Sequence, residues 1–447
     1  MRGTISFLAV PLRRLLPNAH LRQRSGIRMF SFSGGASPRI AIIGAGPAGL
    51  TLARLLQKNG VQCKVFEGEK DRQTRGQGGS LDLHPDKGLL VLKEAGLYDK
   101  FLEHARPEGD VMRILGSDGK VVLDESEDQS EETEKMKTQE GEFGGRPEID
   151  RTKLRDILLE SLEPGTIQWG HRLARARPLS DKPSTPFSLE FVNASPSDHF
   201  DIVVGADGAW SRIRPLLTDA KPVYSGIGGI EVRLADADAR APDLARRVGN
   251  GTCSSYGDNR AVMSQRNGDG SIRTYAFVRM DADWLEQSGI NFEGDVRGSL
   301  RRFVEMHFGS WQDQGAKDMV LGADLDAVVV RNIWMLPVGT RWTHRRGVTL
   351  IGDAAHVMPP FAGVGVNVAM QDALVLAKQI IGVKNLADST AVSHAVRNYE
   401  SEMFDRAEAH AKETMQLQDM QFSERGPYPL VEYFQKQMAA ALAAVER

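Results

Sequence analysis

A glycine-rich motif near the start of the chain, GAGPAG, holds the first residues whose types and spacing could carry chemistry. In such a motif Gly44 permits a tight turn, Gly46 lets the backbone approach a pyrophosphate, and Gly49 lets a helix pack closely on a strand. Ala48 falls in the first helical turn, where unpaired backbone amides attract phosphate. Eighteen residues beyond Gly49, Glu67 ends the next apolar run and can accept hydrogen bonds from both ribose hydroxyls. The motif predicts a dinucleotide site but does not distinguish FAD from NAD.

An ordinary glycine turn would explain this motif without any ligand. Against that alternative, an apolar run at 39–43, apolar residues at helical spacing over 50–56 and a second apolar run at 63–66 occur in the order of a strand–helix–strand unit. This unit predicts the start of a parallel α/β sheet, with a nucleotide at its glycine turn.

A second motif, GADG, follows a predicted strand at 201–204 and precedes an expected helix at 211–217. Taken alone, its Asp207 and Gly208 would form an ordinary Asp-Gly turn. A functional role for this motif therefore depends on the other two.

The third motif, GDAAHVMPPFAGVGVN, is longer and more specific. It follows a buried strand predicted at 348–351, which leaves the carboxylate of Asp353 at a strand end where ligands bind in such sheets. Gly365 precedes a helix predicted to start near Val366, and a helix N-terminus stabilises negative charge such as that of a reduced flavin ring. His356 suggests a catalytic group, but a structural histidine that caps the turn is the favoured interpretation.

Together and in this order, the three motifs resemble those of the class A flavoprotein monooxygenases, the group that contains para-hydroxybenzoate hydroxylase. The similarity is strongest to the tetracycline-inactivating flavin monooxygenases, and it runs from about Arg39 to the C-terminal helix. Two positions depart from that pattern, because Val364 and Glu231 each stand where those enzymes carry Gln. Further matching segments are GSLDLH at 79–84, PEIDR at 147–151, Asn259-Arg260 and PPFAG at 359–363.

The resemblance implies that FAD is bound tightly but without a covalent bond. Glu67 would bind the ribose of its adenosine, Arg151 would hold the extended chain of the cofactor, and Asp353 would make the second ribose contact. Asp82 would contact the flavin region. The residues that would line the isoalloxazine ring are Gly365, Val366 and Asn367.

The resemblance also implies NADPH or NADH as a transient electron donor. Arg75 and Arg260 match positions implicated in docking the nicotinamide cofactor, while Asp207 and Gly208 would serve both FAD and the reductant. Because the sequence has no second dinucleotide motif, the nicotinamide cofactor would bind transiently in a groove rather than in a separate domain.

The implied activity is hydroxylation of an electron-rich aromatic or polyketide-like small molecule. Hydride from the nicotinamide would reduce FAD, O2 would add at the flavin C4a, and the distal oxygen of this hydroperoxide would pass to a nucleophilic carbon. No catalytic side chain is assigned, and the ten histidines show no paired spacing that indicates a metal. An FAD-dependent dehydrogenase or oxidase, or a noncatalytic flavin-binding regulator, is the alternative.

The expected substrate pocket combines one position implied by the resemblance with apolar residues near the flavin. Glu231 occupies the position at which the related enzymes contact substrate. Packing in a core explains the apolar residues equally well. The pocket candidates are Glu231, Met263, Tyr275, Phe277, Phe361 and Gly363.

The fold class expected from these patterns is α/β, with a Rossmann-like FAD-binding domain, an inserted antiparallel-sheet substrate domain and a C-terminal helix. Alternating polar and apolar residues, as at 271–278, indicate the inserted sheet. Helices are predicted at 151–162, 366–381 and 428–445, the last packing against both domains. The expected segments are a leader (1–38), the first FAD-binding part (39–222, with an acidic loop at 124–142), the substrate domain (223–330), the second FAD-binding part (331–390) and a helical tail (391–447).

Composition excludes several classes of protein. A net charge of -3 gives no electrostatic basis for nucleic-acid binding, and no apolar run approaches the roughly 20 residues of a membrane span. The two cysteines cannot build a disulfide framework, which fits a reducing compartment. The expected partners are a small-molecule substrate and O2, for a monomer or a weak dimer.

The first 38 residues contain six arginines and no Asp or Glu, the composition of a mitochondrial transit peptide. A disordered extension, or a true start at Met29, explains the segment as well. We therefore expect a cytoplasmic protein, or a mitochondrial one if the leader directs import.

Overall fold

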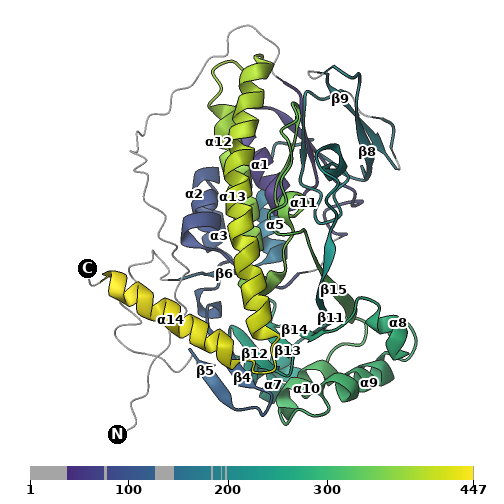
Figure 1. Ribbon diagram of the computed structural model, residues 1–447, viewed down its shortest axis with the longest axis vertical. Coiled ribbons are helices and arrows are strands. Elements are labelled where there is room, and N and C mark those ends of the chain that lie inside the picture. The colour runs from purple at the N-terminus through teal and green to yellow at the C-terminus, as the bar shows by residue number, and fades with distance from the viewer. Residues whose placement is uncertain are drawn as a thin grey trace.

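The computed structural model describes residues 38–74, 78–125, 145–182, 185–192, 194–196 and 199–445. The expectations for Arg75, for nearly all of the leader and for the acidic loop beyond Glu125 concern residues outside these ranges. Within them, the strands form two large sheets and two small ribbons, and a long C-terminal helix runs along most of the length of the molecule (Figure 1). None of the described helices combines the length and hydropathy needed to cross a bilayer.

The first sheet is the predicted nucleotide-binding sheet, and all of its strands are parallel. Its core strands are buried throughout, as expected for a parallel sheet covered on both faces. Helix α1 (Pro47–Lys58) packs against this sheet and against helix α12 (Gly365–Ile381). The strands in spatial order are β16 (Val348–Leu350), β10 (Ile202–Gly205), β1 (Ile40–Ile43), β2 (Cys63–Phe66) and β7 (Ile167–Gln168).

The second sheet has seven strands and is antiparallel except for the parallel pair β12 and β4. One of its faces packs on helices α9 (Val296–Phe308) and α10 (Gln314–Leu321), and the other turns toward the C-terminal helices. The strands in spatial order are β15 (Val329–Met335), β11 (Val223–Leu234), β14 (Ile272–Arg279), β13 (Arg260–Arg266), β12 (Thr252–Gly257), β4 (Met112–Gly116) and β5 (Val121–Asp124).

The second sheet extends beyond the expected limits of the substrate domain at both ends. Strands β4 and β5 come from the segment 39–222 that we assigned to the FAD-binding domain, and β15 continues past residue 330. Strand β4 joins through backbone pairing with β12, more than a hundred residues away, which no local pattern predicts.

Two small antiparallel ribbons complete the strands. Ribbon β3 (Ser80–Asp82) and β6 (Glu148–Asp150) pairs Asp82 with Glu148, and its second strand leads directly into helix α5 (Arg151–Glu160). Strands β8 (Leu173–Pro178) and β9 (Phe187–Phe191) form a hairpin beside the first sheet.

The C-terminal helices agree with the predicted tail. Helix α13 (Ser389–Gln421) begins at Asp388, whose carboxylate accepts hydrogen bonds from the amides of Thr390 and Ala391. It packs on α12 and then passes along the second sheet (Figure 1). Helix α14 (Tyr428–Val445) contacts α13 and β5, and its Leu430 and Val431 belong to the core cluster that also contains residues of the second sheet and packs on η4.

One predicted helix is wrong. The segment 211–217 forms only the short helix η3 (Arg214–Leu216), because the Ser211 hydroxyl accepts the amide hydrogens of Ile213 and Arg214 and Pro215 has no amide hydrogen to donate. The other short helices are η1 (Pro85–Leu89), α2 (Leu90–Ala95), α3 (Tyr98–Leu102), η2 (Pro107–Gly109), α6 (Ala237–Arg240), α7 (Pro242–Val248), α8 (Trp284–Ser288), α11 (Asp353–His356) and η4 (Pro360–Ala362).

Candidate active site

A cavity of about 1960 Å³ begins at the carboxyl ends of the first sheet and ends between the second sheet and the C-terminal helices. Pockets for a drug-sized ligand typically measure about 300–1,000 Å³, so this one has room for a dinucleotide and a further small molecule. Most of the predicted site residues line it: Gly44, Gly46, Ala48, Glu67, Asp82, Arg151, Asp207, Gly208, Met263, Tyr275, Phe277, Asp353, Phe361, Gly363, Gly365 and Val366. Four predicted residues within the described ranges do not line it: Gly49, Glu231, Arg260 and Asn367.

The glycine turn has the geometry that each of its glycines was expected to permit. Gly44 has a φ of +109°, and a Cβ atom there would lie 2.3 Å from the carbonyl oxygen of Ala206. A Cβ on Gly49 would lie 2.1 Å from the carbonyl oxygen of Gly44, so this glycine permits close packing and need not touch a ligand. A Cβ on Gly46 would meet no atom within 4 Å and would project into the cavity.

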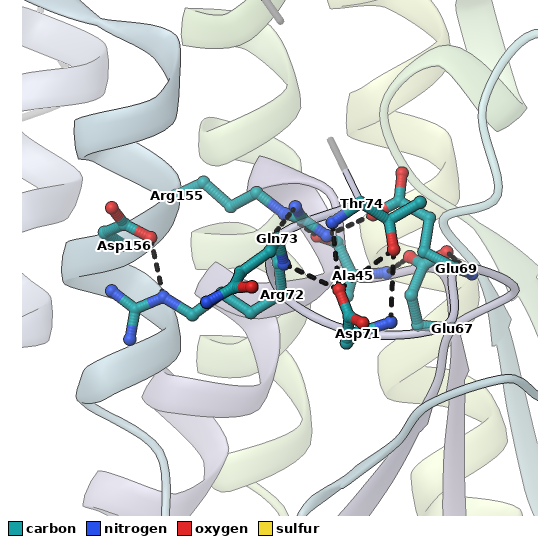
Figure 2. Close-up of polar contacts among 9 residues, drawn as sticks. All are labelled: Ala45, Glu67, Glu69, Asp71, Arg72, Gln73, Thr74, Arg155 and Asp156. Atoms are coloured by element: carbon teal, nitrogen blue, oxygen red, sulfur yellow. Dashed lines mark hydrogen bonds and ion pairs between the residues drawn. The ribbon is translucent and has the colours of Figure 1, made fainter. Parts of the chain in front are cut away.

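Glu67 lies beside this turn, at the end of β2 (Figure 2). Its carboxylate accepts hydrogen bonds from the amides of Ala45 (2.7 Å) and Glu69 (3.0 Å). Each carboxylate oxygen has a further lone pair, so both remain able to accept a ribose hydroxyl. The carboxylate is therefore fixed in position by the backbone before any ligand binds.

Sequence reasoning missed Arg155, a buried residue of α5 that joins the turn to the segment after Glu67 (Figure 2). Its guanidinium pairs with Glu69 (2.7 Å) and donates to the carbonyls of Ala45 and Arg72, each at 3.4 Å. The available signal was a charged residue on the apolar face of a predicted amphipathic helix, since a buried arginine requires partners.

The other end of the cavity contains the N-terminus of α12. The amides of its first turn lack intrahelical acceptors and give this end a partial positive charge. Gly365 and Val366 line the cavity there, and a Cβ on Gly365 would meet no protein atom within 4 Å. These amides are suited to hold an electron-rich ring edge.

Asn367 has a different placement from the one expected. Its side chain is fully buried and ties the segment after β3 to α12, accepting from the amides of His84 (2.8 Å) and Gly88 (3.2 Å) and donating to the carbonyl of Asp82 (2.9 Å). The side chain therefore positions Asp82 rather than facing the cavity.

The second and third motifs meet where β10 and β16 end. One carboxylate oxygen of Asp207 accepts from the amide of Arg212 (2.7 Å), and the other is buried without a hydrogen-bond partner among the described residues. Burial raises the pKa of Asp207 above its ordinary value. Arg214, another residue that sequence reasoning missed, donates to the carbonyls of Asp353 (3.1 Å) and Ala354 (2.8 Å) and so joins the two motifs. The side chain of Asp353 is exposed on the cavity wall.

The wall beyond the flavin end is largely aromatic. Tyr275 and Phe277 have ring centres 5.8 Å apart, and Phe277 meets Phe361 edge-on at 6.4 Å. Met263 is the cross-strand partner of Tyr275. Burial raises the pKa of the Tyr275 hydroxyl, so it remains a hydrogen-bond donor at neutral pH. The apolar residues of α14 on this wall are Leu430, Val431 and Phe434.

Glu231 is the cross-strand partner of Tyr275 and shares its face of the sheet, but it does not line the cavity. Its carboxylate is buried and forms ion pairs with Arg273 and Arg331. Of these three residues Arg331 reaches the cavity, with 43% of its side chain exposed. Any effect of Glu231 on a ligand would therefore act through Arg331.

The expected role of Arg260 in nicotinamide docking is not supported by its position. Side chains alternate along β13, and Arg260 shares its face with Val262, which packs among α9 and α10. Its guanidinium donates to Ser310 at 3.2 Å. The face of β13 that bears Met263 turns toward the cavity instead.

His356 has a structural position, as favoured from the sequence. It is buried, and its Nε2 lies 2.5 Å from a carboxylate oxygen of Asp372, which also accepts from the amide of Gly352 (2.9 Å). The second carboxylate oxygen of Asp372 accepts from Arg406 at 2.8 Å. This network ties the third motif to α12 and α13.

FAD fits these residues. Three glycines, Gly46, Gly208 and Gly365, leave open space where side chains would intrude, and together they mark a path from the glycine turn to α12. The unpartnered oxygen of Asp207 lies on the same path. No group of three or more His, Cys, Asp or Glu side chains among the described residues is arranged to hold a metal ion. The parallel sheet, this cavity and the adjoining mixed sheet define a flavoprotein of the class A monooxygenase type.

The chain belongs to the FAD-binding family of class A monooxygenases, because the model of the family described as "FAD binding domain" matches residues 38–312 and 326–414. Two fungal relatives are similar over nearly their whole length. "Monooxygenase asqM" of Emericella nidulans is 31% identical, with 87% of this chain and 96% of the relative covered. "Monooxygenase penA" of Penicillium thymicola is 32% identical with the same coverage. The protein is an FAD-dependent monooxygenase.

Solved structures confirm the fold. Klebsiella pneumoniae HpxO, complexed with FAD and uric acid, superposes with a TM-score of 0.67 at 21% identity, covering 90% of this chain and 92% of that one. The tetracycline destructase Tet(55) gives a TM-score of 0.66 at 18% identity, covering 90% and 95%. The expected particular similarity to tetracycline-inactivating enzymes is not confirmed, because the fungal monooxygenases are the more similar in sequence.

Proposed function

We propose that the protein hydroxylates an electron-rich aromatic or polyketide-like small molecule, using O2 and either NADPH or NADH. The observation that carries this proposal is the continuity of the cavity, which runs from the residues that fit FAD to the wall formed by Tyr275, Phe277 and Phe361. Such a wall suits a planar ring, since aromatic pairs favour offset and edge-on contacts. A urate hydroxylase from Klebsiella oxytoca, 25% identical, acts on a ring compound and supports this class of substrate.

The residues of this chain bind, orient and exclude water. Glu67 and the glycine turn would hold the adenosine and pyrophosphate, and the amides at the start of α12 would hold the flavin ring. When bound, FAD supplies hydride acceptance and the activation of O2. Apolar residues of α14, such as Phe434, close the far end of the cavity and limit its access to water.

The nicotinamide cofactor would reach the flavin through the same cavity. One sheet with a nucleotide-binding turn is present in the described ranges, so the reductant has no domain of its own there. Asp207 and Gly208, at the carboxyl end of β10, remain the proposed shared contact for FAD and reductant. Arg75 remains a proposed docking residue.

A substrate screen tests this function. Purified FAD-loaded protein is mixed with NADPH or NADH and with polyphenols, anthraquinones or tetracyclines, and nicotinamide consumption and product mass are measured. We expect at least one ring compound to accelerate consumption and to gain one oxygen atom from labelled O2. An oxidised product without added oxygen would indicate a dehydrogenase or oxidase, and FAD binding without any consumption would indicate a noncatalytic regulator.

Replacing Asp353 by alanine is expected to weaken FAD binding about 10- to 100-fold, because a hydrogen bond to a charged group contributes about 1.5–3 kcal/mol. The dissociation constant is measured by fluorescence titration of the apoprotein. The matched control is Asp86→Ala, which removes another exposed carboxylate of the cavity wall, one paired with Lys87. Full affinity in Asp353→Ala, or equal losses in both variants, would contradict the assignment.

A further inference from the structure

Two carboxylates lie side by side at the middle of the cavity, where the flavin end meets the substrate wall. Asp82 and Glu148 are cross-strand partners in the ribbon of β3 and β6, and both line the cavity. Asp82 borders the flavin end, since a Cβ built on Gly363 would lie 3.4 Å from its carboxylate. Glu148 borders the substrate wall, where its carboxylate accepts from the Gln265 amide at 3.0 Å.

The surroundings of Asp82 favour its ionised form. Burial alone would raise the pKa of Asp82, but the hydrogen bond with His84 (3.1 Å) and the guanidinium of Arg146 (3.4 Å) outweigh it. The pKa of Asp82 is lowered as a result. This carboxylate therefore stays charged and does not exchange protons near neutral pH.

The surroundings of Glu148 have the opposite effect. Its side chain is 6% exposed, and burial raises its pKa to about 7, against the lowering effects of Arg106 (2.8 Å), Gln265 and Ser80. The charge on nearby Asp82 adds to the increase. Neighbouring carboxylates whose environments separate their pKa values in this way commonly divide the roles of fixed charge and proton carrier.

The charged groups around Glu148 tolerate its protonation. Arg106 is the cation that faces it, and Asp150 lies 3.8 Å from the same guanidinium nitrogen. That nitrogen also donates to the hydroxyl of Ser80 (2.6 Å) and the carbonyl of Arg266 (3.1 Å). When Glu148 becomes neutral, Arg106 keeps these partners, so no buried cation is left unpaired.

Groups that could hold a hydroxylated ring lie next to Glu148. The side-chain oxygen of Gln265 and the hydroxyl of Tyr275 lie close together, 2.8 and 3.1 Å from where a Cβ on Gly79 would stand, and both residues line the cavity. The amide oxygen accepts a hydrogen bond and the phenol donates one. The cavity beside these two groups and the carboxylate of Glu148 therefore offers a ring hydroxyl an acceptor, a donor and a base.

We propose that Glu148 accepts the proton of a phenolic or enolic hydroxyl group of the substrate. The inference rests on the proposed function. The O–H bond of the substrate breaks, its electron pair stays on the substrate oxygen, and the proton ends on a carboxylate oxygen of Glu148. No electrons are exchanged, and the resulting phenolate or enolate has a more nucleophilic ring carbon for oxygen transfer.

The pH dependence follows from the ionisation of Glu148. The carboxylate accepts a proton only in its charged form, and its pKa is raised to about 7. Oxygen insertion by the wild type should therefore increase as the pH rises through about 7. In Glu148→Gln this step in the pH profile should disappear. If Glu148 had only a structural role, the pH profile of the variant would keep the step.

The experiment follows the ionisation of a bound phenol without any turnover. FAD-loaded wild type, Glu148→Gln and Glu148→Asp are titrated with alizarin, a polycyclic phenol whose absorption moves to longer wavelength on ionisation. We expect the ionisation of bound alizarin to be coupled to that of Glu148, so that its midpoint in the wild type lies at least about one pH unit above that in Glu148→Gln, a tenfold or greater effect, because the charged carboxylate opposes a neighbouring phenolate. Glu148→Asp keeps the carboxyl group but shortens the side chain by one methylene, so it should restore the shift in part.

The matched control is Glu413→Gln. Glu413 lines the same cavity from α13 and pairs with His410 at 3.3 Å, so this variant removes a cavity carboxylate away from the ribbon. Ionisation as in the wild type is expected. Equal ionisation in wild type and Glu148→Gln, or the same loss in the control, would overturn the proposal.

A different observation would contradict the proposed function. If FAD binds but no ring compound is hydroxylated, the monooxygenase substrate class is wrong, while the alizarin titration still measures proton acceptance by Glu148. If hydroxylation proceeds and Glu148→Gln leaves both the titration and the pH profile unchanged, Glu148 is a structural residue and the function stands.

Discussion

Replacing Gly46 by valine is expected to give a folded protein that no longer holds FAD. The backbone of Gly46 is extended (φ -82°, ψ 177°), a conformation that valine adopts readily, and a Cβ there meets no protein atom within 4 Å. The valine side chain would instead occupy the part of the cavity where the pyrophosphate approaches the backbone. We expect the affinity for FAD to fall by at least about 100-fold, or about 2.8 kcal/mol.

The matched control is Gly49→Val in the same motif. A Cβ on Gly49 would lie 2.1 Å from the carbonyl oxygen of Gly44, so this change should damage the fold itself. FAD titration and the thermal unfolding midpoint are measured for both variants. Gly46→Val should lose FAD while keeping the unfolding midpoint of the wild-type apoprotein, and Gly49→Val should lower that midpoint. Normal FAD affinity in Gly46→Val would refute the location of the pyrophosphate.

The second large effect is expected from Asp372→Asn, which should destabilise the fold by about 3–5 kcal/mol, the usual result of breaking a buried ion pair. Asp372 is fully buried and faces His356 and Arg406, whose side chains are 8% and 11% exposed. Without the carboxylate, Arg406 becomes a largely buried cation with a single exposed partner, Glu402. Chemical denaturation at neutral pH measures the change.

The stability provided by this network should depend on pH in both directions. Burial alone would raise the pKa of Asp372, but His356 and Arg406 outweigh it and lower it, so this contribution is present above about pH 3.9 and is lost as the pH falls through the lowered value. Burial alone would lower the pKa of His356, but Asp372 raises it, so this contribution is present below about pH 6.5 and is lost as the pH rises through the raised value.

The matched control for Asp372→Asn is Glu402→Gln. Glu402 pairs with the same Arg406 at 3.0 Å, but 55% of its side chain is exposed, and such surface pairs contribute at most about 1 kcal/mol. We expect unfolding midpoints to fall in Asp372→Asn and to change little in Glu402→Gln. Equal midpoints in both variants would show that the buried carboxylate does not stabilise the third motif.

The nucleotide half of the molecule could be predicted from the sequence because its determinants are local. The glycine turn and Glu67 each directly follow a strand, the third motif follows β16 and leads into helix α12, and the structure places all three along one cavity. The helical tail and its last helix, α14, were also predicted from the pattern of the C-terminal segment. In these segments local pattern and global fold agree.

The rest depended on contacts between distant residues. Glu148 and Gln265 are neighbours only because β6 and β13 meet across the cavity, and the register of β13 turns Arg260 away from it. The ion pairs of Glu231 with Arg273 and Arg331 likewise join β11, β14 and β15. A one-residue change of register would reverse these faces, and periodicity alone does not specify register here.

Calorimetric titration of the apoprotein with FAD and with FMN tests the central claim, that one extended dinucleotide is held at both ends of the cavity. We predict one FAD per chain, and FMN binding at least about 100-fold weaker, because FMN lacks the adenosine that Glu67 and the glycine turn would hold. A protein that binds no FAD, or that binds FMN as tightly as FAD, would contradict this account.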